Sequence, residues 1–206
     1  MSKLDVPRAI STPIKELGES ERALFKQHLL DLEADDRYLR FGNPLSDEAI
    51  TNYVDRIDFA TDTVFGVFDD ALTLVAAGHF APTRDDAPGA VKSAEFGLSV
   101  ATIARGKGLG TALFYRAASH ARNLQIATLF MHCLSQNRAM IRIARKAGME
   151  IQQSQGEADA YLSLPPGDLA SAIEEGVQEQ IAIFDYAIKR HLLAARGAFR
   201  RPVALA

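Results

Sequence analysis

Residues 94–113 read A-E-F-G-L-S-V-A-T-I-A-R-G-K-G-L-G-T-A-L, an apolar segment, a glycine-rich turn and the start of a second apolar segment. This order predicts a strand, a turn and a helix. Glycines let backbone N–H groups approach a ligand closely, and a helix N-terminus favours an anion. The turn therefore predicts a phosphate or pyrophosphate site. It consists of Arg105, Gly106, Lys107, Gly108, Leu109, Gly110 and Thr111.

Two common phosphate-binding motifs do not fit this turn. The dinucleotide pattern G-x-G-x-x-G, begun at Gly106, requires a third glycine where the chain has Thr111. The P-loop requires Ser or Thr after Gly-Lys, and here Lys107 is followed by Gly108. Spacing excludes both motifs.

Arg105, Gly108 and Gly110 match the pattern Gln/Arg-x-x-Gly-x-Gly/Ala, and here the chain resembles the GNAT superfamily of acyl-CoA-dependent N-acyltransferases. A strand over 94–100, a helix to about 123, a strand over 127–134 and a helix over 137–148 follow in the family's order. The resemblance implies an α/β fold with a mixed, mostly antiparallel sheet flanked by helices. It also implies that the turn holds the pyrophosphate of acetyl-CoA, the co-substrate, and that no metal takes part. A chance glycine turn in another α/β domain is the alternative.

The segment 36–41, D-R-Y-L-R-F, together with residues 94–96, is similar to the GNAT domains of bacterial protein lysine acetyltransferases. Arg37 and Arg40 are candidates for facing the acceptor substrate. Alternatively, they are solvated or pair locally with Asp35 and Asp36. This region does not identify the acceptor, so a small-molecule amine and a protein lysine both stay open.

Glu95 is the candidate general base, because the resembling family often places a glutamate in this strand. The implied reaction is attack of a neutral amine on a thioester, and an alkyl amine is mostly protonated at neutral pH. The strand is otherwise apolar, so we expect Glu95 to be partly buried with a raised pKa. A strand-end glutamate facing solvent is the alternative. No activated nucleophile is visible, so direct transfer in a ternary complex is expected.

The resemblance also assigns backbone and amide groups to the coenzyme. The N–H groups of Leu98, Ser99 and Val100 are expected to bind the pantetheine arm and the oxyanion of the tetrahedral intermediate. Asn137 is expected to hydrogen-bond the pantetheine, or to cap the following helix.

The chain departs from the family at Ala144, where many relatives have a tyrosine that protonates the leaving thiolate. The thiolate either leaves without a side-chain acid, or Tyr161, His132 or Ser135 takes part. Ala144 also favours a second hypothesis, a catalytically weak acyl-CoA sensor or assembly module.

Composition agrees with a cytoplasmic enzyme. The chain has 206 residues, 48% of them hydrophobic, and a formal net charge of -3, which argues against a general nucleic-acid binder. Its single cysteine, Cys133, suits a reducing compartment. The first eleven residues contain no apolar signal segment, and no apolar run reaches membrane-spanning length.

The remaining segments predict alternating elements before the motif. We expect a short strand near residues 8–12, helices that begin near Ser20 and Ser46, a hairpin of 63–68 and 72–80, and a polar loop over 82–89.

The Pro165-Pro166-Gly167 break predicts a boundary between a GNAT-like domain, residues 1–165, and a C-terminal helical extension, residues 166–206. A long amphipathic helix is expected from about 168 to 196. Its apolar stripe packs on its own domain or pairs with a second copy, and acids that precede bases favour an antiparallel homodimer. The stripe consists of Leu169, Ile173, Val177, Ile181, Phe184, Ile188 and Leu192.

Overall fold

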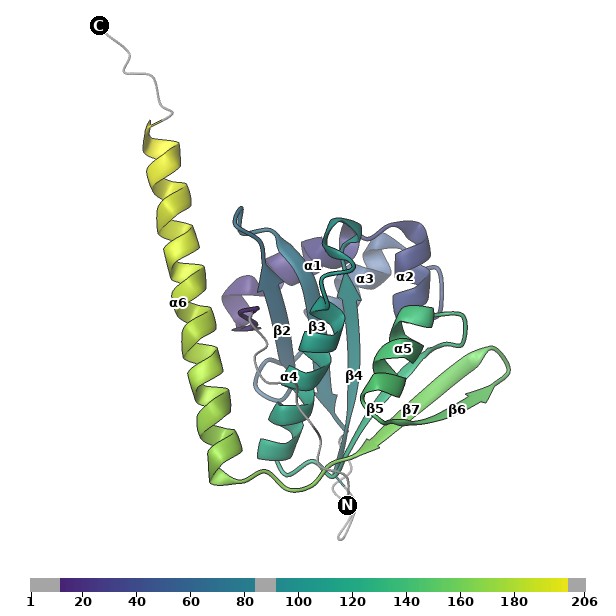
Figure 1. Ribbon diagram of the computed structural model, residues 1–206. Helices are drawn as coiled ribbons and strands as arrows, with labels where there is room; N and C mark the ends of the chain where they lie inside the picture. The colour runs from purple at the N-terminus through teal and green to yellow at the C-terminus, as the bar shows by residue number, and fades with distance from the viewer. Residues whose placement is uncertain (1–11, 84–91, 200–206) are drawn as a thin grey trace, which may run out of the picture.

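A computed structural model describes residues 12–83 and 92–199, and it contains one seven-stranded sheet (Figure 1). The strand order is β1-β2-β3-β4-β5-β7-β6, and every pair is antiparallel except β4 and β5, which run parallel. The mixed, mostly antiparallel sheet expected from the sequence is confirmed. The strands are β1 Lys15–Leu17, β2 Thr63–Phe68, β3 Leu74–Pro82, β4 Ser93–Val100, β5 Thr128–Leu134, β6 Glu150–Ser154 and β7 Glu157–Ser163.

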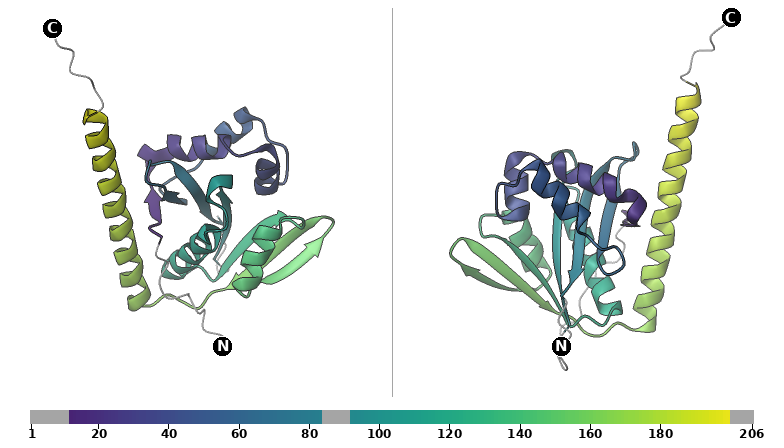
Figure 2. Two further views of the ribbon diagram at one scale, coloured as in Figure 1. Left: turned by 45° about the horizontal axis from the view of Figure 1, so that its top comes forward. Right: turned by 180° about the vertical axis from the view of Figure 1, so that it is seen from behind.

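Helices cover both faces of this sheet (Figures 1 and 2). The three helices before β2 pack on one face around buried Phe25, Leu29 and Ile50, and α4 and α5 pack on the other around Phe96 and Phe114. The helices are α1 Arg22–Leu30, α2 Ala34–Phe41, α3 Asp47–Asp55, α4 Leu109–Asn123, α5 Arg138–Lys146 and α6 Leu169–Phe199, with 3-10 turns at Glu19–Glu21 and Thr102–Ala104.

The hairpin β2–β3 and the helix that follows Ser46 are confirmed, and the Ser46 hydroxyl accepts from the Ala49 N–H at 3.2 Å. The helix expected near Ser20 is confirmed as α1, but Ser20 does not cap it. A 3-10 turn occupies residues 19–21, so α1 begins after Glu21. The strand expected near residues 8–12 and most of the loop over 82–89 lie outside the described residues.

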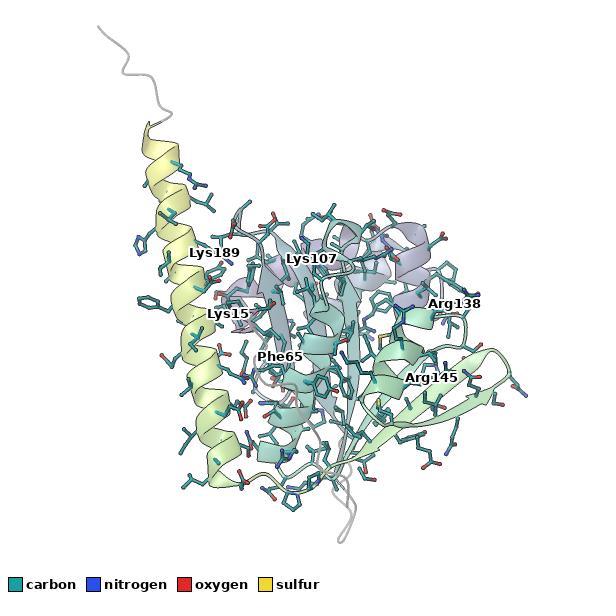
Figure 3. The ribbon with its side chains drawn as sticks, in the orientation of Figure 1. Lys15, Phe65, Lys107, Arg138, Arg145 and Lys189 are labelled. Carbon is teal, nitrogen blue, oxygen red and sulfur yellow. The ribbon has the colours of Figure 1, made fainter. Side chains whose placement is uncertain are left out.

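The long C-terminal helix is confirmed as α6, which lies beside edge strand β1, whereas β6 forms the opposite edge of the sheet (Figure 2). Its inner face includes buried Ala182, and Lys189 donates to the Phe68 carbonyl at 3.1 Å. In Figure 3, Lys15 and Lys189 lie between α6 and the sheet. The apolar stripe faces away from the domain, and Phe184 is 69% exposed. The stripe therefore does not pack on its own domain.

Of the helices described, none has the length and hydropathy needed to span a membrane.

Candidate active site

The candidate site begins where β4 and β5 separate. The two strands pair only from Ser93 with Thr128 to Glu95 with Phe130, after which β4 continues beside β3 alone. The backbone groups of residues 97–100 on the β5 side therefore have no strand partner. A cavity of about 630 Å³ lies beside this unpaired end of β4, with α2, α4 and α5 as its other walls.

The glycine turn closes one end of this cavity. Gly106 and Gly108 both have φ of +77°, a left-handed conformation that suits glycine. Gly108 is also the N-cap of α4, so the first N–H groups of the helix have no side-chain partner there. A Cβ at Gly110 would lie 3.0 Å from Cδ1 of Ile143, which shows how closely α4 approaches α5.

The structure brings the predicted coenzyme residues together in this one cavity, with Lys107 as the exception. Lys107 lies at the start of α4, and Arg138 lies at the same end of the molecule (Figure 3). The lining residues from the prediction are Leu98, Ser99, Val100, Arg105, Gly106, Gly108, Leu109, Gly110, Thr111 and Asn137.

Cations outnumber acids around the cavity. Arg105 forms an ion pair with Asp36, so its charge is partly neutralised within the protein. Arg138 and Arg142 also line the cavity from α5, although the sequence interpretation did not include them. The two arginines follow Asn137 and are four residues apart, which places them on one face of the helix. This spacing was the sequence signal that could have identified them. The excess of positive charge suits a polyphosphate ligand.

Two of the predicted coenzyme-binding residues have side chains that already form hydrogen bonds within the protein. The Asn137 Oδ1 accepts from the Met140 N–H at 3.1 Å, so the capping alternative is confirmed, and its Nδ2 donates to the Leu39 carbonyl at 3.2 Å. The Ser99 hydroxyl lies 2.9 Å from Nε2 of His28, whose Nδ1 donates to the Leu74 carbonyl at 2.8 Å. Burial lowers the pKa of His28, which is therefore neutral and pins the end of β4 to α1.

Glu95 lies outside the large cavity, and the expectation that it is partly buried is wrong. Alternation along β4 sends Phe96 into the core with α4, and Glu95 to the opposite face, where it is exposed. It lines two adjoining hollows. One, of about 600 Å³, is an open groove that includes Phe130, Asp159 and Tyr161.

The second hollow, of about 250 Å³, connects Glu95 to the large cavity. Arg40 lines both this hollow and the large cavity, so the two meet at its side chain. We call this second hollow the inner pocket. It is lined by Arg40, Phe41, Gly42, Tyr53, His79, Ala81, Glu95, Gly97, His132 and Cys133.

The two arginines of the 36–41 segment differ in their surroundings. Arg37 pairs with Asp47 and donates to the Leu32 carbonyl at 3.1 Å, so it fastens α2 to its neighbours. The local-pairing alternative therefore holds for Arg37, with Asp47 in place of Asp35 or Asp36. Within the described part of the chain, Arg40 has no carboxylate partner.

None of the candidate general acids lines the large cavity. Tyr161 lies in the outer groove, the Ser135 hydroxyl donates to the Gly156 carbonyl at 3.0 Å, and His132 contacts Asp159 at 2.8 Å. Ala144 is 1% exposed and packs in the core, so α5 presents no acid from this position.

Among residues 12–83 and 92–199, no three His, Cys, Asp or Glu side chains are grouped as metal ligands.

Comparison with known proteins agrees with this geometry. A family model described as an acetyltransferase (GNAT) domain matches residues 19–150. A comparison with curated proteins found no match. Among solved structures, the GNAT domain of S. lividans PAT is similar with a TM-score of 0.62 and 19% identity over 73% of this chain and 89% of that one.

Two other similar structures have different substrates in their descriptions. The ribosomal-protein-alanine N-acetyltransferase from Brucella melitensis has a TM-score of 0.54 and 19% identity, over 73% of this chain and 99% of that one. The spermidine N-acetyltransferase from Vibrio cholerae, in complex with CoA and spermine, has a TM-score of 0.55 and 16% identity, over 73% and 94%. At these identities the likeness shows the fold.

Proposed function

Because the chain belongs to the acetyltransferase (GNAT) family, we propose that it transfers an acetyl group from acetyl-CoA to a primary amine in a ternary complex. Acyl transfer from coenzyme A to an amine is the chemistry of this family. The observation that carries the proposal is the cavity beside the unpaired end of β4, bounded by α4 and α5 and closed by the glycine turn.

The cavity suggests how acetyl-CoA binds. The pyrophosphate lies against the N–H groups at the start of α4, with positive charge from Arg138 and Arg142 of the lining and from Lys107 in the adjoining turn. The unpaired edge of β4 binds the pantetheine arm, and a backbone N–H among residues 98–100 stabilises the oxyanion. The second hydrogen on Nδ2 of Asn137, which is not donated to Leu39, is donated to the coenzyme near its thiol.

Direct transfer fits the surroundings of the cysteine. Cys133 is buried, and burial raises the pKa of its thiol, so it is a poor nucleophile. Glu95 is the proposed base, because it stands where the inner pocket opens to solvent and can accept a proton from an arriving ammonium group.

Glu95→Gln is expected to lower kcat/KM for the amine about tenfold, less than a fully enclosed base would, because water also reaches this exposed position. The measurement is coenzyme A release at saturating acetyl-CoA and varied amine concentration. Glu150→Gln, at an exposed position on edge strand β6, is the control. An unchanged kcat/KM would remove Glu95 as the base.

The buried Ala144 favours the second candidate, an acyl-CoA sensor with little catalysis. Both candidates predict that acetyl-CoA raises the melting temperature. Only an enzyme releases free thiol with a panel of small amines and lysine peptides. The same panel separates a small acceptor from a protein lysine.

The exposed stripe of α6 suggests a homodimer. The stripe spans 23 residue steps from Leu169 to Leu192, about 35 Å of helix. Exposed acids Asp168 and Glu174 lie near its beginning, and exposed bases Arg190 and Arg196 near its end. Antiparallel pairing buries the two stripes and brings opposite charges together.

We further propose that residues 1–165 form the catalytic unit and that residues 166–206 carry the dimer contact. The lone cysteine suggests that the enzyme acts in the cytoplasm.

The double variant Ile181→Glu/Phe184→Glu is expected to convert the dimer to a monomer, because it places four charges in the paired stripes. Light scattering at micromolar protein should give twice the chain mass of 22.4 kDa for the wild type and a single chain mass for the variant. Ala172→Glu, exposed on the same helix and off the stripe, should remain dimeric. A monomeric wild type would contradict the proposal.

A further inference from the structure

Four side chains from separate elements form a continuous hydrogen-bond chain along the inner pocket. Arg40 Nη2 of α2 lies 3.1 Å from the Tyr53 hydroxyl of α3. That hydroxyl lies 2.7 Å from Nδ1 of His79 on β3. Nε2 of His79 lies 3.2 Å from Oδ2 of Asp62, which precedes β2. We call these residues the relay.

With a neutral His79 and an ionised Asp62, one arrangement of protons satisfies all three bonds. The Arg40 guanidinium can only donate, so the Tyr53 oxygen accepts. The phenolic O–H must then donate to Nδ1 of His79, which accepts the hydrogen bond through its lone pair. Nε2 of His79 therefore carries the ring proton and donates to Asp62. In this arrangement the histidine is neutral, and the Tyr53 oxygen keeps a second lone pair free for a donor.

The position of Arg40 puts the relay beside the site where the thioester of acetyl-CoA is expected. A Cβ on Gly97 would lie 2.6 Å from Cζ of Arg40, so the guanidinium rests directly on the β4 backbone at that glycine. Gly97 immediately precedes the β4 residues that line the coenzyme cavity. The guanidinium also lies 5.0 Å from the Phe41 ring centroid and 5.9 Å from that of Tyr53. The relay therefore begins where the two cavities meet.

We propose that Tyr53 takes the second proton from the reacting amine and passes its own proton to His79. This inference rests on the proposed acetyltransferase function. An ammonium group must lose two protons to become an amide, and Glu95 at the solvent edge takes the first. The neutral amine attacks the thioester carbonyl, which forms the C–N bond and leaves a positive nitrogen and a negative oxygen.

The relay then completes the transfer. The nitrogen gives its proton to the Tyr53 oxygen while the phenolic proton moves to Nδ1 of His79. His79 becomes an imidazolium ion paired with Asp62, the C–S bond breaks, and coenzyme A leaves as the thiolate. His79 returns its proton to Tyr53, and Tyr53 releases one to water once the amide has left. Tyr53 is the catalytic residue, whereas His79 and Asp62 act through it.

The electrostatics of the inner pocket favour this starting state. Burial, reinforced by the positive charge of Arg40, lowers the pKa of His79, although Asp62 opposes the shift. Burial raises the pKa of Tyr53, so its proton stays in place until it is exchanged. A neutral imidazole and an intact phenol are what the relay requires at neutral pH. The titratable and charged groups that face His79 in the pocket are Arg40, Tyr53, Asp62, Glu95, His132 and Cys133.

Tyr53→Phe tests the relay, since it removes the hydroxyl and keeps the ring. It is expected to lower kcat 10- to 100-fold, with the KM for acetyl-CoA and the coenzyme-induced thermal shift unchanged. Tyr38→Phe, at an exposed position on α2, should match the wild type. An unchanged kcat in Tyr53→Phe would overturn the relay and leave the proposed acetyltransferase function intact.

Asp62→Asn tests the relay through the pH dependence of kcat, which would not change if the relay residues only supported the structure. Asp62 raises the pKa of His79, so its neutralisation should shift the acidic limb of kcat to lower pH. A limb that stays in place would count against the relay. A wild-type enzyme that releases no thiol with any amine would overturn the proposed function and the relay together.

Discussion

Arg116→Met is expected to lower the free energy of unfolding by about 3 kcal/mol, because it removes one partner of a buried ion pair. Arg116 of α4 is 2% exposed, pairs with Glu175 and lies 3.3 Å from Glu179, both on α6. Its Cζ lies 4.8 Å from the Phe65 ring centroid. For a chain of this size the loss corresponds to about 6–12 °C in Tm, measured by calorimetry or circular dichroism.

Two variants control this result. Arg190→Met, an exposed arginine on α6, should change stability by less than about 0.5 kcal/mol. Adding Glu175→Gln to Arg116→Met should recover much of the loss, since the carboxylate nearest to the lost guanidinium is then uncharged. Equal losses in the single and double variants would show that packing of the arginine, and not its charge, holds α6.

The pH dependence of stability provides an independent check. Burial opposes ionisation of Glu175, but hydrogen bonds from His120 and Asn123 and the charge of Arg116 lower its pKa from 4.5 to about 2. The folded pKa is below the unfolded one, so this stabilisation is complete above pH 4.5 and is lost as the pH falls toward 2. Over that range the wild type should lose about 2 kcal/mol more than Glu175→Gln, a figure discounted for residual solvent.

Gly108→Val is expected to weaken coenzyme A binding by roughly 100-fold, about 3 kcal/mol. A β-branched residue is strained at a φ of +77°. Relief of the strain turns the backbone N–H groups away from the pyrophosphate, and two lost charge-assisted hydrogen bonds account for the energy. Isothermal titration with coenzyme A measures the change.

Gly148→Val is the matched control. Gly148 has φ of +72° and, like Gly108, has open space where a Cβ would stand, but it follows α5 and does not line the cavity. Both variants should lose similar stability, and only Gly108→Val should lose coenzyme affinity. Equal affinities in the two variants would exclude the turn as the pyrophosphate site.

The elements that the sequence predicted correctly have strong local signals. Glycines and cations define the turn before α4, and two β-rich runs around Asp69-Asp70 define the hairpin. The strand β6 was missed because its sequence, E-I-Q-Q-S, is polar and mostly exposed at the sheet edge. The helix α2 was missed because it is short and contains no fully buried residue.

The unpredicted parts of the site depend on contacts between distant segments. Arg40, Tyr53, Asp62 and His79 come from three elements and a loop, and no spacing rule links them. Periodicity predicted that α6 is amphipathic, but it did not show which face meets the domain. The helix α6 meets the domain through Glu175 with its three donors and through Tyr186 against Phe68, residues that lie off the apolar stripe. The stripe therefore points outward.

The position of α6 beside β1 has a consequence for enzyme kinetics. The coenzyme cavity lies beside β4, an interior strand of the sheet, and its lining includes no residue of α6. In a dimer joined through α6, each cavity is complete within one chain. Saturation by acetyl-CoA should then be hyperbolic, with a Hill coefficient of about 1. Turnover per chain should also stay constant on dilution, so the two subunits would work as independent catalysts.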